Sequence, residues 1–127
     1  MQNILFSVAG NKSCTEVSKW LTNHDIPFIE RRISTASPLK SKELFNLLSI
    51  SQNGFEDIIK RNITHIKINE KDVSIEDLTT NELVSIIINN PAIFKTPILT
   101  TSDKILTGFK INELEDFFAK NKNDSSA

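Results

Sequence analysis

The stretch that decides the fold is residues 3–30, NILFSVAGNKSCTEVSKWLTNHDIPFIE. Its first part, Asn3–Val8, is a short apolar run rich in strand formers, and Gly10 after it allows the chain to turn. Its last part, Ile26–Glu30, is predicted to be a second strand, because Pro27 cannot occupy a helix interior. A strand, a crossing segment of helix length and another strand predict a parallel, right-handed βαβ unit. The predicted fold class is therefore α/β.

The crossing segment has the pattern of a helix with one buried face. Its apolar side chains recur at helical spacing: Cys14, Val17, Trp20 and Leu21. Asn11 is one candidate cap, because its side-chain oxygen can accept a hydrogen bond from an amide of the first turn. Ser13 with Glu16 forms a competing capping box two residues later, so the pattern leaves the helix start open between the two.

The rest of the chain alternates element signals with turn signals. The predicted elements are a helix at Ser41–Leu48, a further helix at Phe55–Ile59 after a break at Gln52–Gly54, a helix capped by Thr79 or Thr80 and ended by Asn89-Asn90-Pro91, an antiparallel hairpin of strands at Pro97–Thr101 and Lys104–Leu106, and a helix at Asn112–Phe118. This order predicts a thioredoxin-like mixed four-stranded sheet with a helical insertion. We expect one domain over residues 1–119, with thioredoxin-like parts at about 1–33 and 92–119 and the insertion at about 34–91. The polar tail, 120–127, is predicted to be disordered.

Composition limits the classes of function. Lys and Arg number 15 and Asp and Glu number 16, so no net charge draws the chain to nucleic acid or to an anionic membrane. One cysteine excludes an internal disulfide, and the chain has neither an apolar run of about 18 residues nor the layout of a secretion signal. These features predict a cytoplasmic protein without membrane contact. His24 and His65 lie far apart with no ligand pattern around them, so neither a metal nor another cofactor is expected.

Several groups of residues follow, in order and at near-constant spacing, the pattern of a known family. They are Trp20-Leu21, Ile26–Arg31 (IPFIER), Asn53-Gly54 with Ile58-Ile59, Asn90-Pro91 with Thr96-Pro97-Ile98, and Gly108-Phe109. Together they resemble the Spx and arsenate reductase (ArsC-like) family up to about residue 118, and the IPFIER stretch and the Gly54 context look more like Spx transcriptional regulators than like the reductases. Spx proteins bind the C-terminal domain of the RNA polymerase α subunit, whereas the reductases attack arsenate with a cysteine thiolate. The resemblance therefore implies either a regulator or a thiol enzyme.

The resemblance places Asn11 and Cys14 on the two cysteines of the family's CxxC motif, so the first cysteine of the redox pair is replaced. The apolar helix face on which Cys14 lies favours a buried thiol that serves as a small hydrophobic side chain. Its position near the helix start leaves a nucleophile or redox sensor open as a second interpretation. A rival register puts Cys14 on the first, nucleophilic position, as in single-cysteine members of the family.

Reductase chemistry also needs arginines that hold an anionic substrate through paired hydrogen bonds. By resemblance, these positions fall on Asn62 and Thr96, and the neighbouring Arg61 and Lys95 do not restore the same pair of guanidinium groups. Our first hypothesis is therefore a Spx-like regulator that lacks the intramolecular disulfide switch. The alternative is a single-cysteine arsenate reductase-like oxidoreductase, coupled to glutathione or thioredoxin, that uses Cys14.

The resemblance further implies a partner surface around Gly54. In Spx, the glycine of this turn is needed for contact with the α subunit, and Ser51, Gln52 and Asn53 would flank the contact here. Glycine permits a positive φ and close approach of another backbone, although a glycine that only ends a helix has the same properties. The family's proline, here Pro97, follows a cis peptide bond and faces the CxxC turn, which implies a structural role. DNA contact is expected only through the polymerase complex, and clearance by a cytoplasmic protease is a further implied interaction.

Overall fold

The computed structural model describes residues 2–126, and for residues 119–126 it describes the backbone only. The strands are β1 (Ile4–Val8), β2 (Ile29–Ile33), β3 (His65–Ile68), β4 (Lys71–Ser74), β5 (Ile98–Thr100) and β6 (Ile105–Thr107). The α-helices are α1 (Lys12–Asn23), α2 (Ser41–Ile50), α3 (Thr80–Asn89) and α4 (Ile111–Ser126). Three short 3-10 helices, η1 (Gly54–Asp57), η2 (Ile75–Asp77) and η3 (Pro91–Ile93), connect them.

A mixed four-stranded sheet forms the centre of the molecule, with the strand order β2-β1-β5-β6. β1 is parallel to β2, with Ile4 opposite Ile29, and antiparallel to β5. β5 and β6 form the antiparallel hairpin that the sequence predicts. The βαβ unit and the mixed four-stranded sheet are therefore confirmed, and the segment between β2 and β5 is the insertion.

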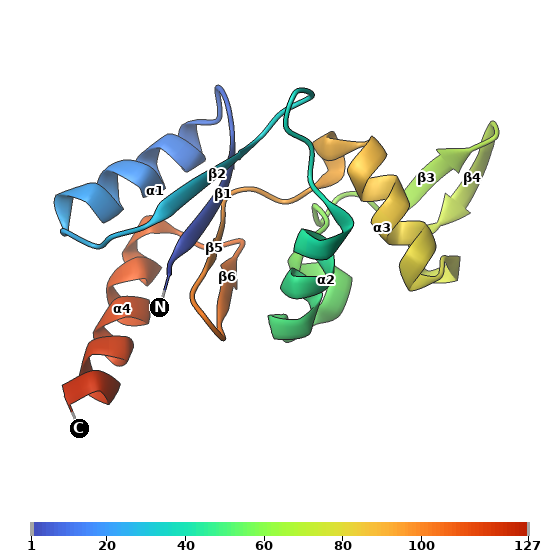
Figure 1. The fold of residues 1–127 in the computed structure, drawn as a ribbon. Helices are drawn as coiled ribbons and strands as arrows, with labels where there is room; N and C mark the ends of the chain where they lie inside the picture. The colour runs from blue at the N-terminus through green and yellow to red at the C-terminus, as the bar shows by residue number, and fades with distance from the viewer. Residues whose placement is uncertain (1, 127) are drawn as a thin grey trace.

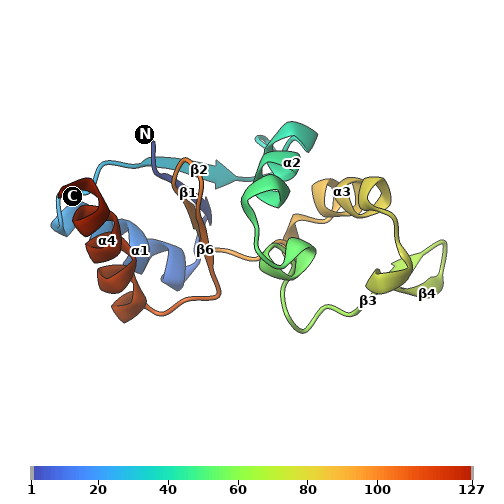
Figure 2. The same cartoon turned by 90° about the horizontal axis from the view of Figure 1, so that it is seen from below.

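The two faces of the sheet belong to two separate apolar cores, because side chains alternate along each strand. Leu5 and Leu99 lie in one core with residues of α1 and α4, among them the fully buried Leu21 and Leu114. The residues of the other face lie in the second core with the insertion: Phe6, Ile33 and Ile98 with Leu39, Leu44, Leu47, Ile58, Ile59, Leu83, Val84, Ile87 and Phe94. Figures 1 and 2 show α1 and α4 on one side of the sheet and the insertion on the other.

The second strand begins at Ile29 and not at Ile26 as predicted. The amide of Ile26 still donates to the carbonyl of Leu21 at 3.0 Å, so this residue belongs to the turn that closes the C-terminal end of α1. Phe28 packs against the core between the sheet and α1, and strand pairing starts only where the Ile29 amide donates to the Asn3 carbonyl at 2.8 Å. The sequence signal found the strand, but its bounds were wrong by three residues.

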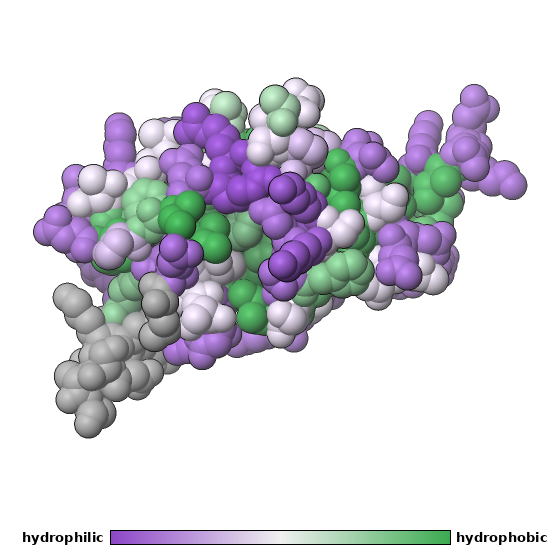
Figure 3. All heavy atoms as spheres, viewed as in Figure 1, coloured by the Kyte–Doolittle hydropathy of each residue, from purple (hydrophilic) through white to green (hydrophobic). Residues whose placement is uncertain are grey.

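The insertion is not entirely helical, because it contains a second, two-stranded sheet formed by β3 and β4. The turn between the strands has positive φ at both central residues, 51° at Asn69 and 68° at Glu70, as a type I′ hairpin turn requires. Ile66 lies opposite Val73 across the hairpin. The sequence signal was missed because the turn lacks the usual glycine. Figure 3 shows hydrophilic side chains that project from the hairpin tip.

The helix predicted over Phe55–Ile59 is a single helical turn, η1, in which the Ile58 and Ile59 amides donate to the Phe55 carbonyl at 3.0 and 2.9 Å. Ile59 forms an isolated antiparallel bridge with Phe94, and the Lys95 amide donates to the Ile58 carbonyl at 2.6 Å. Both isoleucines are buried, as the apolar pattern predicts, and the sequence did not indicate the pairing of this segment with Phe94 and Lys95. At the other end of the chain, α4 continues to Ser126 beyond the helix predicted to end at residue 118. The side chains of residues 119–127 and the whole of Ala127 lie outside the described part, and the disorder of residues 120–127 stays a prediction.

Candidate functional site

The turn between β1 and α1 begins with Asn11, which is the N-cap of the helix. Its Oδ1 accepts a hydrogen bond from the Cys14 amide at 3.0 Å, and its backbone carbonyl accepts from the Thr15 amide at 3.1 Å. The Thr15 hydroxyl also donates to this carbonyl, at 3.2 Å. Of the two caps that the sequence allows, the structure therefore has the one two residues earlier. In the register that places Asn11 and Cys14 on the two motif positions, this amide side chain stands at the first of them.

Cys14 lies inside the first turn of α1 and points into the protein. Its exposed fraction is 4%, and it shares the inner face of α1 with Val17 and Leu21. It is a free cysteine. This placement confirms the interpretation of Cys14 as an inward-facing residue. A nucleophile must contact its substrate, and the native protein offers little thiol surface for such a contact.

The peptide bond between Thr96 and Pro97 is cis, as the resemblance implies. The preceding residue, Lys95, is held across the insertion because its Nζ donates to the Glu56 carbonyl at 2.8 Å. Lys95 and Arg61 line the same cavity of about 750 Å³, beside the hairpin and the segment around Gly108. The acidic residues Glu56, Asp57 and Glu76 line this cavity as well, so the residues around it carry charges of both signs.

Neither Asn11 nor Cys14 is among the residues that line this cavity. The structure therefore does not bring the thiol and the two cations into one pocket among the residues that it describes. Within the same part of the chain, no three His, Cys, Asp or Glu side chains are grouped as a metal site requires. The described helices also include none that is long and apolar enough to cross a bilayer.

The Gly54 turn joins α2 to η1 and is open on its outer side. Gly54 has a φ of +62°, and a Cβ built there meets no other atom within 4 Å. Gln52 and Asn53 are exposed, and Ser51 ends α2 with its hydroxyl donating to the Leu48 carbonyl at 2.9 Å. The structure thus presents all the residues predicted for a partner contact on one turn, as their adjacency in the chain requires.

Asp57 holds the Gly54 turn, and sequence reasoning did not identify it. One of its carboxylate oxygens accepts hydrogen bonds from the amides of Gln52 at 3.0 Å and Asn53 at 3.1 Å, and the other accepts from the Asn53 side chain at 3.4 Å. A carboxylate that closes a turn on amides four and five residues earlier is a local signal. The signal in the sequence is an aspartate three residues after the glycine, Asp57, which is a residue type that accepts hydrogen bonds from turn amides.

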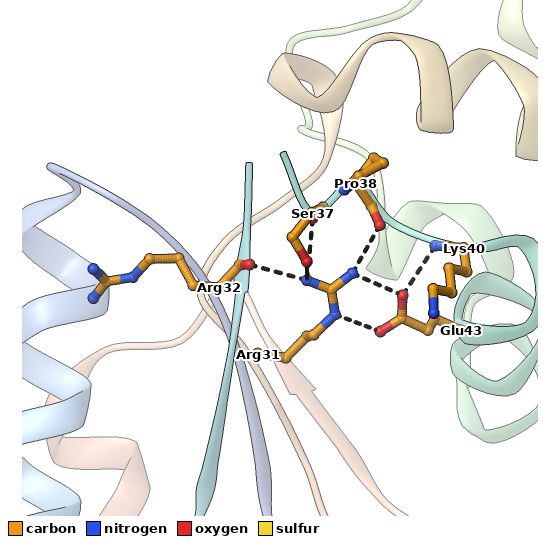
Figure 4. A network of polar contacts seen from close by, with 6 residues as sticks. All are labelled: Arg31, Arg32, Ser37, Pro38, Lys40 and Glu43. Atoms are coloured by element: carbon orange, nitrogen blue, oxygen red, sulfur yellow. Dashed lines mark hydrogen bonds and ion pairs between the residues drawn. The ribbon is translucent and has the colours of Figure 1, made fainter. Parts of the chain in front are cut away.

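At the other end of α2, Arg31 of β2 forms a dense polar network (Figure 4). Its Nε and one terminal nitrogen donate to the two carboxylate oxygens of Glu43 at 2.7 and 3.0 Å, which is a bidentate pair. Burial opposes ionisation of Glu43, but hydrogen bonds from Arg31 and from the Lys40 amide hold the pKa of this carboxyl below its ordinary value. The Glu43 bond in turn raises the pKa of Arg31. In the sequence, Arg31 is recognisable only as the last residue of the IPFIER stretch, and nothing near it indicates the pair with Glu43.

Comparison with protein families settles the evolutionary relationship. The model of the ArsC family matches residues 9–117 of the chain. The chain belongs to the ArsC family. Among characterised family relatives, the global transcriptional regulator Spx of Streptococcus mutans is 35% identical over 117 residues, which cover 91% of this chain and 82% of that protein. Spx of Streptococcus pneumoniae is 34% identical over the same length and is covered to 85%.

Solved structures of the ArsC family share the fold. An ArsC family related protein from Bacteroides fragilis superposes with a TM-score of 0.68 at 22% identity, covering 91% of this chain and 97% of that one. A possible arsenate reductase from Streptococcus mutans gives a TM-score of 0.65 at 13% identity and covers 90% of this chain and 98% of that one. At these identities the likeness concerns the fold alone. The thioredoxin-like architecture predicted from the sequence is therefore shown.

Proposed function

We propose that this protein is a Spx-like transcriptional regulator that binds the C-terminal domain of the RNA polymerase α subunit. The observation that supports this most is the 35% identity with the regulator Spx, which extends over 91% of the chain. The same relationship supports the coarser statement that the chain is related to transcriptional regulators that work with the polymerase. The net charge of −1 favours DNA contact through the polymerase complex over direct binding.

The Gly54 turn supports the choice of contact surface. No atom lies within 4 Å of the position that a Cβ would take at Gly54, so the outer side of this turn is free for another chain. The hydrogen bonds that the Gln52 and Asn53 amides donate to Asp57 hold the turn closed, so little ordering remains to be done on binding. We place the partner contact on Ser51–Gly54.

The proposed regulator has no intramolecular disulfide switch, because the chain contains one cysteine. Cys14 is buried, and Asn11 occupies the exposed helix start where a reactive thiol would be stabilised. These two features disfavour the reductase alternative, which needs an accessible nucleophile. Under this proposal the protein acts in the cytoplasm, binds the polymerase irrespective of redox state, and is removed by a protease that recognises its C-terminus.

Titration calorimetry with the purified α C-terminal domain tests the contact. Gly54→Arg is expected to abolish binding, since the side chain occupies the space that the partner needs. Gly10→Arg is a matched control, because Gly10 has a φ of +74° and equally open surroundings but lies in the β1–α1 turn. Both substitutions carry similar backbone strain, on the order of 1 kcal/mol. Failure of the unmodified protein to bind at concentrations on the order of tens of micromolar would refute the proposal.

The redox part of the proposal has its own test. Binding to the α domain is measured after treatment with a thiol oxidant and after treatment with a reductant. We expect the same dissociation constant in both states. A change of about tenfold or more, reversed by the reductant and absent in Cys14→Ala, would show that the remaining thiol regulates binding.

A further inference from the structure

We infer that Arg31 is a positioning residue that fixes the direction of α2, and with it the Gly54 turn, relative to the sheet. This inference rests on the proposed function for its biological meaning, because it concerns the same partner surface. Its structural basis is the polar network in Figure 4, which lies at the place where the chain passes from the sheet into the insertion. Neither the family relationship nor the turn itself gives Arg31 this role.

Every nitrogen of the Arg31 guanidinium is used. In addition to the bidentate pair with Glu43, one terminal nitrogen donates to the Pro38 carbonyl at 2.8 Å. The other donates to the Arg32 carbonyl at 2.9 Å and to the carbonyl and hydroxyl of Ser37 at 3.1 and 3.0 Å. A single side chain thus binds β2, the loop that leaves it and the first turn of α2 at once.

Glu43 makes this network specific for the direction of α2. Glu43 is the third residue of that helix. One of the two carboxylate oxygens that Arg31 binds also accepts a hydrogen bond from the Lys40 amide at 2.9 Å, and this bond caps the helix start. The helix start is therefore tied to β2 by the group that caps it. The side chains of Arg31 and Glu43 are only 19% and 24% exposed, so water screens the pair less than it screens an ordinary surface pair.

Apolar packing alone does not determine the direction of α2 as sharply. Leu44 and Leu47 bury α2 in the core with Phe6 and Ile33, but hydrophobic contact has no preferred direction. A guanidinium–carboxylate fork fixes both distance and angle. α2 has 10 residues and is therefore about 15 Å long, so a tilt of about 10° at its start moves its far end by roughly 2.6 Å.

The far end of α2 is where the Gly54 turn begins. A displacement of that size exceeds the tolerance of roughly 0.5 Å for a preorganised contact. The second passage between sheet and insertion has different ties, namely the backbone hydrogen bonds from Lys60 to Ile93 at 2.9 Å and from Lys95 to Ile58 at 2.6 Å. These bonds anchor η1 and the residues after it, and Asp57 of η1 also holds Gln52 and Asn53, whereas Arg31 anchors α2.

Amide hydrogen exchange of the full chain tests this inference without any partner. Arg31→Lys keeps the charge but loses the fork, and Glu43→Gln removes the charge of the acceptor. We expect both variants to speed exchange about fivefold or more in α2 and at the Gln52 and Asn53 amides, with β1 and β5 unchanged. Arg32→Lys is the matched control, because Arg32 lies on the same strand, is 60% exposed and pairs with Glu30 at 2.9 Å.

Binding to the α domain forms the second arm of the experiment. Arg31→Lys is expected to weaken binding about tenfold and Arg32→Lys to leave it unchanged. If the unmodified protein does not bind, the proposed function fails, while the exchange pattern still decides on Arg31. Faster exchange spread evenly over the whole chain, or an exchange pattern equal to that of Arg32→Lys, would overturn the positioning role.

Discussion

The N-cap of α1 gives the sharpest test of how the turn between β1 and α1 keeps Cys14 buried. In Asn11→Ala, the Cys14 amide loses the oxygen that accepts its hydrogen bond at 3.0 Å. Loss of such a cap costs about 1 kcal/mol, which for a domain of this size lowers the melting temperature by roughly 4 °C. Cys14 lies within the first turn, so fraying of this turn exposes its sulfur. The same 1 kcal/mol raises the open population about fivefold.

Alkylation of the thiol by iodoacetamide measures this opening directly. The Cys14 thiol is only 4% exposed, so it reacts mainly when the start of α1 opens. If this opening costs about 3 kcal/mol or more, the unmodified protein reacts at least about 100-fold more slowly than the urea-unfolded chain. Asn11→Ala should react about fivefold faster than the unmodified protein. Asn11→Asp, which keeps an acceptor at the helix start, should not. A native thiol as reactive as the unfolded one would refute the burial argument.

Three further outcomes are expected. Asp57→Ala removes the acceptor for two amides of the Gly54 turn, so thermal unfolding should show a loss of about 1 kcal/mol and calorimetry a weaker contact with the α domain, whereas Asp57→Asn retains most of both. The pKa of Glu43 is held below its ordinary value despite burial, so its pair with Arg31 stabilises the fold above the unfolded pKa of about 4.3, and this contribution is lost as the pH falls through the lower folded pKa. Urea unfolding between about pH 7 and pH 3 should therefore show a shallower acid loss for Glu43→Gln, and an unchanged slope would contradict the assignment. Ile87→Ala, at a fully buried position of α3, should cost about 3 kcal/mol, while Ser85→Ala on the exposed face of that helix should change stability by less than about 0.5 kcal/mol.

Local patterns predicted the parts of the candidate site that depend on neighbouring residues. The helical spacing of Cys14 with Val17 places the thiol on the inner face, and the structure confirms this. Asn11 was one of two possible caps, and periodicity could not choose between them because both lie within one turn of the helix start. The bounds of β2 were wrong because pairing with β1 decides where a strand begins, and that pairing is not encoded in the strand itself.

Features of the insertion were less predictable for a related reason. The apolar residues at Ile58 and Ile59 indicated burial, but their backbone pairs with a segment about 35 residues later, which local spacing does not reveal. The β3–β4 hairpin was missed because Asn69 and Glu70 adopt positive φ without the glycine that usually indicates such a turn. In both places, the sequence specified which side chains are buried and left the path of the backbone open.

The sequence by itself determined the α/β class, the order of the elements around the sheet and the inward direction of Cys14. These properties follow from the spacing of apolar side chains, which each segment contains within itself. Only the tertiary structure decided how the insertion is held on the sheet. Besides the shared apolar core, that attachment includes the pair of Arg31 and Glu43, which are 12 residues apart and meet because β2 and the start of α2 come together in the fold. A charged side chain has many possible partners along the chain, and only the folded backbone brings one of them within reach.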